Sequence, residues 1–212
     1  MVFKQGTEFS PKEFWDKKIL DWELSRYGPL RHVPGSLEKA VRLSNNSVNY
    51  RLALAKELLV PNCRNQRIVE FGCGSARMAE SLIDAGATSY TGIDVAPAGI
   101  ESAIRRISNY RLASQIRLDT GDITDTFNVE ADIVVSLGLT DWLDECQLEK
   151  LFLISEGLDF LHSFSELRSN PTQWLHKVYV HLAYGKKSGG YVPRYYNIDQ
   201  MAKRLESGQT KP

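Results

Sequence analysis

The sequence predicts an α/β protein: a doubly wound, mainly parallel sheet with helices on both faces and a helical cap at the N-terminus. Two short apolar, β-branched stretches, residues 67–71 and 89–94, flank a stretch with helical spacing at 76–85. Two glycines follow the first stretch at once, and the second ends in Asp94. A strand, a glycine loop, a helix and a second strand make a right-handed βαβ unit. The loops of such units gather at the carboxyl ends of the strands, where nucleotides bind.

Length and composition favour one globular α/β domain. The chain has 212 residues, of which 42% are hydrophobic and 25% charged. The 26 acidic and 26 basic residues balance, so we expect no nucleic-acid partner. No apolar run is long enough for a membrane span and the start lacks a signal-peptide core, so we expect a cytoplasmic protein. The three cysteines form no C-x-x-C pair, and we expect them to be unpaired.

Helices are expected before the first strand. The run Ser10-Pro11-Lys12-Glu13 is a helix-start signature, and the helix should extend to about Arg26 with Trp15, Ile19 and Trp22 on one face. Further helices are expected from Ser36 and over residues 48–59. Because they precede the sheet, these helices must pack outside it or over the mouth of its site. We divide the chain into a cap region, residues 1–62, and a sheet domain, residues 63–212, within one structural unit.

The remaining elements alternate along the chain. A capping box at Asp144 to Gln147 predicts one helix start. Strands are expected at residues 115–120, 131–136 and 157–163, and helices at 97–110, after 144, at 171–184 and at 198–206.

The glycine loop indicates which nucleotide binds. Arg77 stands where the dinucleotide fingerprint has its third glycine, and Glu70 would repel a pyrophosphate but suit a cation. The pattern Glu70-x-Gly72-x-Gly74 resembles motif I of the class I, Rossmann-like methyltransferases that use S-adenosylmethionine. That cofactor carries a sulfonium and an ammonium and no phosphate. Asp94 does not discriminate, because an acid at this spacing binds a ribose diol in either family.

The resemblance implies a cofactor site at the ends of successive strands. An acid and its apolar neighbour after the third strand, Asp122 and Ile123, would grip the adenine. The alternative is that Asp122 only stabilises a turn. The segment after the fourth strand would touch the reacting end of the cofactor. The implied cofactor-binding residues are Glu70, Gly72, Cys73, Gly74, Asp94, Val95, Asp122, Ile123, Leu137 and Trp142.

The acceptor site is less defined. In the resembled family the N-terminal segment and an insertion after strand 5 cover the acceptor, which gives four candidates: Tyr27, His32, Arg194 and Tyr196. Packing of the tyrosines onto the domain is the alternative. Ser136-Leu137-Gly138-Leu139 replaces the (Asp/Asn)-Pro-Pro-aromatic motif of methyltransferases that act on base amines, which disfavours a nucleobase acceptor.

Methyl transfer needs acceptor and methyl group held about 3 Å apart in a dry pocket. A base is required only for an acceptor such as a hydroxyl, and the candidates are His162, Glu166, Tyr195 and His32. No His, Cys and Asp cluster has metal-ligand spacing, so we expect no metal.

The end of the chain departs from the resembled family. Class I methyltransferases usually finish with strands 6 and 7, and nothing strand-like follows Ser207. We therefore expect a five-stranded parallel sheet that lacks these strands, or a truncated chain. An uncovered sheet edge presents unpaired backbone N–H and C=O groups to another chain, so a homodimer through that edge is one expectation.

The favoured function is transfer of a methyl group from S-adenosylmethionine to a small or medium-sized acceptor, at an O, N or C atom that the sequence leaves open. The alternatives are an NAD(P)-binding oxidoreductase, a methyltransferase of a protein or glycan, and a protein that binds the cofactor without chemistry.

Overall fold

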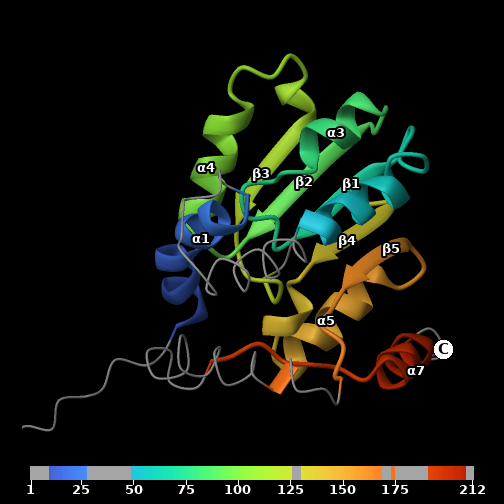
Figure 1. The fold of residues 1–212 in the computed structure, drawn as a ribbon. Coiled ribbons are helices and arrows are strands. Elements are labelled where there is room, and N and C mark those ends of the chain that lie inside the picture. Colours follow the sequence, from blue (N-terminus) through green and yellow to red (C-terminus); the bar gives the residue numbers. More distant parts are fainter. Residues whose placement is uncertain (1–9, 28–48, 126–129, 169–172, 175–190, 209–212) are drawn as a thin grey trace, which may run out of the picture.

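The computed structural model describes residues 10–27, 49–125, 130–168, 173–174 and 191–208. A five-stranded parallel sheet forms its centre, with the strand order β3-β2-β1-β4-β5 (Figure 1). The strands are β1 (Arg67–Phe71), β2 (Ser89–Asp94), β3 (Ile116–Thr120), β4 (Ile133–Leu137) and β5 (Asp159–Ser163). The order reverses between β1 and β4, which confirms the predicted doubly wound fold.

Helices cover both faces of the sheet. The helix of residues 49–59, α3 (Ala79–Asp84) and α4 (Pro97–Ile107) pack on one face, around the side chains of Ile68 and Tyr90. On the other face α5 (Glu145–Ser155) and α7 (Ile198–Gly208) cover a second apolar cluster. None of the helices in the described part of the chain is long and apolar enough to span a membrane.

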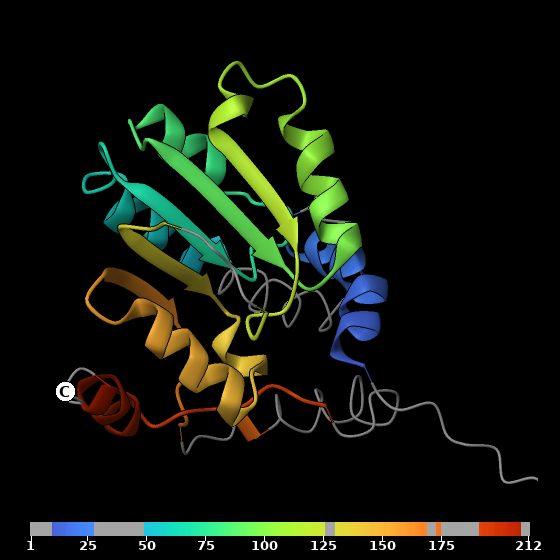
Figure 2. The same cartoon turned by 180° about the vertical axis from the view of Figure 1, so that it is seen from behind.

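The first helix, α1 (Pro11–Tyr27), lies at the carboxyl ends of the strands, as Figures 1 and 2 both show. Two of its acids fix it there. The Asp16 carboxylate accepts a hydrogen bond from the Ala98 N–H at the start of α4, at 2.8 Å. The Glu23 carboxylate accepts one from the Ser75 N–H in the glycine loop, also at 2.8 Å. Helix α1 is therefore positioned to cover whatever this end of the sheet binds.

One predicted helix begins later than its sequence pattern suggests. The spacing predicts a helix from residue 76, but α3 begins at Ala79. The chain first passes through left-handed backbone at Gly74 and Ala76, both with φ +52°. Arg106 of α4 holds this turn by donating to the carbonyl oxygens of Ser75 and Ala76. A tertiary contact therefore outweighs the helical preference of the sequence.

Two predicted helices cannot be compared in full. The helix expected from Ser36 lies outside the described residues, and of the helix expected over residues 171–184 only 173–174 are described, as helical. No sixth or seventh strand occurs within the ranges that the structure describes.

Candidate cofactor and acceptor site

A cavity of about 270 Å³ opens at the carboxyl ends of the strands. Its floor is the glycine loop after β1, together with the ends of β2 and β4, and α1 lies over it. Among its lining residues are Trp15, Ile19, Trp22, Glu23, Arg51, Glu70, Gly72, Cys73, Gly74, Arg77, Asp94, Val95, Asp122, Ile123, Leu137, Asp141, Trp142, Ser165, Tyr191 and Tyr195.

The glycine loop is a tight bend that requires its glycines. Gly72 has φ +70°, and a Cβ there would lie 3.0 Å from the Cβ of Leu139. A Cβ at Gly74 would lie 2.6 Å from Oε1 of Glu23. The N–H groups of Gly72 and Cys73 both donate to the Ile93 carbonyl, at 2.8 and 3.2 Å. The bend is thereby tied to the end of β2.

The floor beneath this bend is closely packed. A Cβ at Gly92 in β2 would lie 2.9 Å from Sγ of Cys73 and 2.9 Å from Cδ2 of Leu118. Under about 3.0 Å such a contact requires a neighbour to move. The absence of a side chain at Gly92 therefore leaves room for the Cys73 thiol against β2.

Two buried acids lie under the cavity. Glu70, at the end of β1, accepts a hydrogen bond from the Tyr90 hydroxyl, and burial raises its pKa to about 8 despite that bond. Asp94, at the end of β2, accepts from the N–H groups of Gly74 at 2.8 Å and Ala96 at 2.9 Å. Burial raises the pKa of Asp94, and these two N–H groups oppose the shift.

The third acid, Asp122, lines the cavity and also stabilises a turn. Its Oδ1 accepts from the N–H and hydroxyl of Thr124, at 2.9 and 2.7 Å. Its Oδ2 accepts from Nε2 of Gln147, at 2.8 Å. The turn role considered from the sequence is therefore present, and Oδ2 keeps a lone pair for a further donor.

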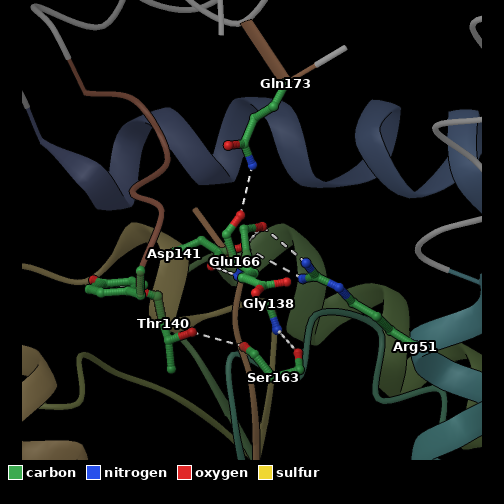
Figure 3. Close-up of polar contacts among 9 residues, drawn as sticks. Arg51, Gly138, Thr140, Asp141, Ser163, Glu166 and Gln173 are labelled. Carbon is green, nitrogen blue, oxygen red and sulfur yellow. Dashed lines mark hydrogen bonds and ion pairs between the residues drawn. The ribbon is translucent and has the colours of Figure 1, made fainter. Parts of the chain in front are cut away.

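Hydrogen bonds connect the loops after β4 and β5 around Asp141 (Figure 3). The Asp141 carboxylate, 5% exposed, accepts from the N–H and hydroxyl of Ser165, at 2.6 and 2.7 Å. Arg51 reaches in from the helix of residues 49–59, with Nη1 3.5 Å from Asp141 and Nη2 3.0 Å from the Ser165 hydroxyl. Burial raises the pKa of Asp141, and Ser165 and Arg51 oppose the rise. These three residues form one polar corner of the cavity.

Aromatic side chains form another wall. The rings of Trp15 and Trp142 meet edge to face with centroids 4.8 Å apart, and Trp142 and Tyr191 lie 5.2 Å apart. Trp15 also donates its indole N–H to the Tyr191 hydroxyl, at 3.3 Å. Trp22 and Tyr195 complete this surface, which we call the aromatic wall. It joins α1 to the loop after β4 and to the segment that begins at Tyr191.

The cavity gathers all ten residues expected to bind the cofactor. Of the three candidate catalytic residues that the structure describes, it includes Tyr195 but neither His162 nor Glu166. Glu166 is ion-paired with Arg168 at 2.7 Å, outside the cavity lining.

His162 is held by two serines away from the cavity. The Ser155 hydroxyl donates to the Leu151 carbonyl, so it accepts from Nε2–H of His162, and Nδ1 accepts from the Ser136 hydroxyl. Both contacts are 2.9 Å, and burial lowers the pKa of His162 to about 4. His162 therefore lies outside the cavity lining, and its role as a base stays a prediction.

None of the candidate acceptor residues that the structure describes lines the cavity. The Arg194 guanidinium is 3.4 Å from Glu145, and the Tyr196 hydroxyl donates to the Thr140 carbonyl at 3.1 Å; neither residue lines the cavity. The side chain of Tyr27 and the whole of His32 lie outside the described residues.

Sequence reasoning missed three charged residues of the cavity: Glu23, Arg51 and Asp141. A signal for Glu23 was present, because it follows Trp15, Ile19 and Trp22 at helical spacing and so shares their face. No comparable pattern marks Arg51 or Asp141, whose contacts join segments far apart in the chain.

Comparison with known proteins agrees with this geometry. Residues 68–154 match the model of a family described as "Methyltransferase domain". The fold is similar to that of magnesium protoporphyrin IX methyltransferase from Synechocystis PCC 6803 with bound SAH (TM-score 0.66, 14% identity, 93% of this chain and 86% of that chain covered). It is also similar to SibL, an S-adenosylmethionine-dependent methyltransferase in its apo form (TM-score 0.60, 18% identity, 93% of this chain and 63% of that chain covered). A third such methyltransferase, from Mesorhizobium loti, matches with a TM-score of 0.55 and 17% identity, covering 73% of this chain and 78% of that chain.

At these identities the solved structures show the shared fold, and the family match adds the activity. Residues 68–154 therefore match a methyltransferase domain, in a chain with the class I, Rossmann-like methyltransferase fold. The protein is an enzyme that uses S-adenosylmethionine. The acids at three strand ends line the cavity beside the glycine bend, and they fit a cofactor that carries a positive charge.

Proposed function

We propose that the enzyme methylates a small or medium-sized acceptor bound between the aromatic wall and Arg51. The observation that carries this is the composition of the cavity beyond the glycine loop, which aromatic rings and the Arg51 guanidinium line together. Aromatic rings favour a flat acceptor, and a guanidinium favours one with a carboxylate or a similar anionic group. Arg51 takes the place that the sequence suggested for Arg194.

We propose that the ten cavity residues expected from the sequence bind the cofactor. Asp94 would hold the ribose hydroxyls, Asp122 and Ile123 the adenine, and Leu137 and Trp142 the reacting end. Glu70, Gly72, Cys73, Gly74 and Val95 would form the cradle around the rest. The support is that all of them line one cavity.

When bound, the cofactor supplies a methyl group that a positive sulfur already activates. The chain's own contribution is then to orient the acceptor and exclude water. Burial raises the pKa of Tyr195, so its hydroxyl stays protonated near neutral pH and would donate a hydrogen bond to the acceptor. We infer that Tyr195 orients the acceptor rather than acting as a base.

The test of cofactor binding compares ligands and one variant. S-adenosylhomocysteine should raise the melting temperature of the protein, and NAD should not. Asp94→Asn should bind S-adenosylhomocysteine about tenfold or more weakly in calorimetry, because charge-assisted bonds to the ribose are lost. The exposed Asp84→Asn, whose partners are Tyr110 and Arg111, is the matched control. Equal affinity in the wild type and Asp94→Asn would remove Asp94 from the site.

The test of the acceptor class uses a labelled methyl donor. Small aromatic carboxylates should accept label, and Arg51→Met should raise KM for them more than for uncharged analogues of the same shape. Label found only on proteins or glycans would favour the macromolecular alternative.

We further propose a cytoplasmic location. All three cysteines are free, and Cys146 is exposed. Free thiols persist in reducing compartments. Recovery of the protein from an oxidising compartment with these cysteines paired would contradict this.

A homodimer through β5 is also proposed. β5 is the last strand in the sheet order, and Phe160 on it is 36% exposed. Its outer edge pairs with no strand among the described ranges. Sedimentation equilibrium should show a dimer, and a monomer at every concentration would exclude it.

A further inference from the structure

We propose that Glu23 of α1 is a cofactor-binding residue whose carboxylate pairs with the ammonium group at the methionine end of S-adenosylmethionine. The inference rests on the proposed placement of the cofactor in the cavity and extends the site to a helix outside the sheet. The glycine loop would thus bind the cofactor together with α1.

Glu23 is held in contact with the glycine loop. Its Oε1 is 2.8 Å from the Ser75 nitrogen, and the residue is 7% exposed and lines the cavity. The same oxygen lies 2.6 Å from the position that a Cβ at Gly74 would take. Glu23 and the glycine bend therefore border the same small volume.

The buried carboxylate lacks a strong cationic partner among the described residues. Its ion pair is with Arg77, at 3.9 Å, and the Arg77 side chain is 37% exposed. A buried carboxylate is costly unless it is closely paired and hydrogen-bonded. The cost rises here because the Asp94 carboxylate lines the same cavity, and the charge of Glu23 contributes to raising the pKa of both Glu70 and Asp94. A cation bound among these acids would offset it.

An unpartnered polar atom lies beside Glu23. The hydroxyl of Ser75, the residue whose N–H binds Glu23, belongs to a residue that is 2% exposed, and it has no hydrogen-bond partner among the residues that the structure describes. Buried hydroxyls nearly always have a partner. A polar group of the ligand is therefore expected at this point.

The chemistry of the cofactor favours its ammonium as the partner. The sulfonium has no N–H or O–H to donate, and the cofactor's carboxylate would meet a like charge at Glu23, which already accepts from the Ser75 N–H. The ammonium carries three donors and a positive charge. Among the cofactor's charged groups it is the one that complements Glu23.

The experiment measures binding of two ligands to Glu23→Gln by calorimetry. S-adenosylhomocysteine keeps the ammonium, whereas 5′-methylthioadenosine lacks the whole amino-acid end. Glu23→Gln should bind S-adenosylhomocysteine about tenfold more weakly, because a charge-assisted hydrogen bond is lost, and bind 5′-methylthioadenosine within about twofold of the wild type.

Asp16→Asn is the matched control, because Asp16 also anchors α1 but bonds to Ala98 and does not line the cavity. Asp16→Asn should change the affinities for S-adenosylhomocysteine and 5′-methylthioadenosine by the same factor. If Asp16→Asn weakened binding of S-adenosylhomocysteine selectively, by as much as Glu23→Gln does, the inference would be overturned.

Other outcomes also overturn it. Equal loss for both ligands in Glu23→Gln would show that Glu23 only positions α1. Tighter binding of S-adenosylhomocysteine would show that Glu23 competes with the cofactor's carboxylate. A wild-type protein that binds neither ligand would refute the cofactor placement itself, a result distinct from failure of the Glu23 pairing.

Discussion

Single residues determine how this site responds to pH. Burial raises the pKa of Glu70 from 4.5 to about 8, so the folded protein keeps a proton there that the unfolded chain releases. Between pH 4.5 and 8 the folded state thus binds more protons, and the free energy of unfolding falls as pH rises. Stability due to Glu70 is fully present below about pH 4.5 and is lost by pH 8.

Glu70→Gln tests this directly, since the amide keeps an acceptor for Tyr90 and cannot ionise. The stability of the variant relative to the wild type should increase with pH from 5 to 8, by at most about 1.4 kcal/mol per pH unit. Urea unfolding at several pH values measures it. A constant difference over that range would mean that Glu70 ionises normally.

His162 shows why residue roles are harder to predict than residue positions. Its place in a strand was predicted, and an imidazole near a strand end is a reasonable candidate base. Which neighbours its ring meets depends on Ser136 in β4 and Ser155 in α5, and the chain brings these together only on folding. The glycine bend could be predicted because its signal is local.

At the scale of elements, the start of α5 links stability to the site. Asp144 and Gln147 form the predicted capping box, with bonds of 2.8 and 3.0 Å. The amide nitrogen of Gln147 also donates to Asp122. The cap thus orients an acid of the cavity as well as fixing the start of the helix.

Asp144→Ala should lower the free energy of unfolding by about 1 kcal/mol, the usual cost of losing an N-cap acceptor. Urea unfolding measures it, and the exposed Glu149→Ala in the same helix is the control. A loss no larger than that of the control would mean that the cap contributes nothing to stability.

The elements themselves were predicted well where local signals mark their ends. The capping box gave the start of α5, and Pro97 gave the start of α4. The predicted start of α3 was three residues too early. The left-handed backbone at Ala76 depends on Arg106, which lies thirty residues further along the chain.

At the scale of the molecule, the two helices before the sheet pack on it in different ways. Ala55, Leu59 and Cys63 pack in the same apolar cluster as the sheet, so the helix of residues 49–59 is part of the core. Helix α1 instead meets the sheet end through Asp16, Glu23 and its aromatic side chains. The proposed cap region therefore includes a segment that the core needs.

Deletion of residues 1–48 should leave a protein that unfolds cooperatively but binds S-adenosylhomocysteine at least about tenfold more weakly, since the cavity loses Trp15, Trp22 and Glu23. Circular dichroism melting and calorimetry test the two parts. Unchanged affinity would show that α1 takes no part in binding the cofactor.

The doubly wound sheet and the cofactor class followed from the sequence because a strand, two glycines and an acid are close together in it. The acceptor side did not, because α1, Arg51 and the segment from Tyr191 come together only in three dimensions.

The close contact between Cys73 and the bare backbone at Gly92 has a consequence for how the enzyme can diversify. Any larger residue at Gly92 would have to displace the side chains of Cys73, Leu118 and Tyr90, so the base of the pocket tolerates little remodelling. The rings and charges above it, carried on segments outside the sheet, have no such restriction. New substrates should therefore be acquired by changes in those outer segments, while nucleotide recognition stays constant.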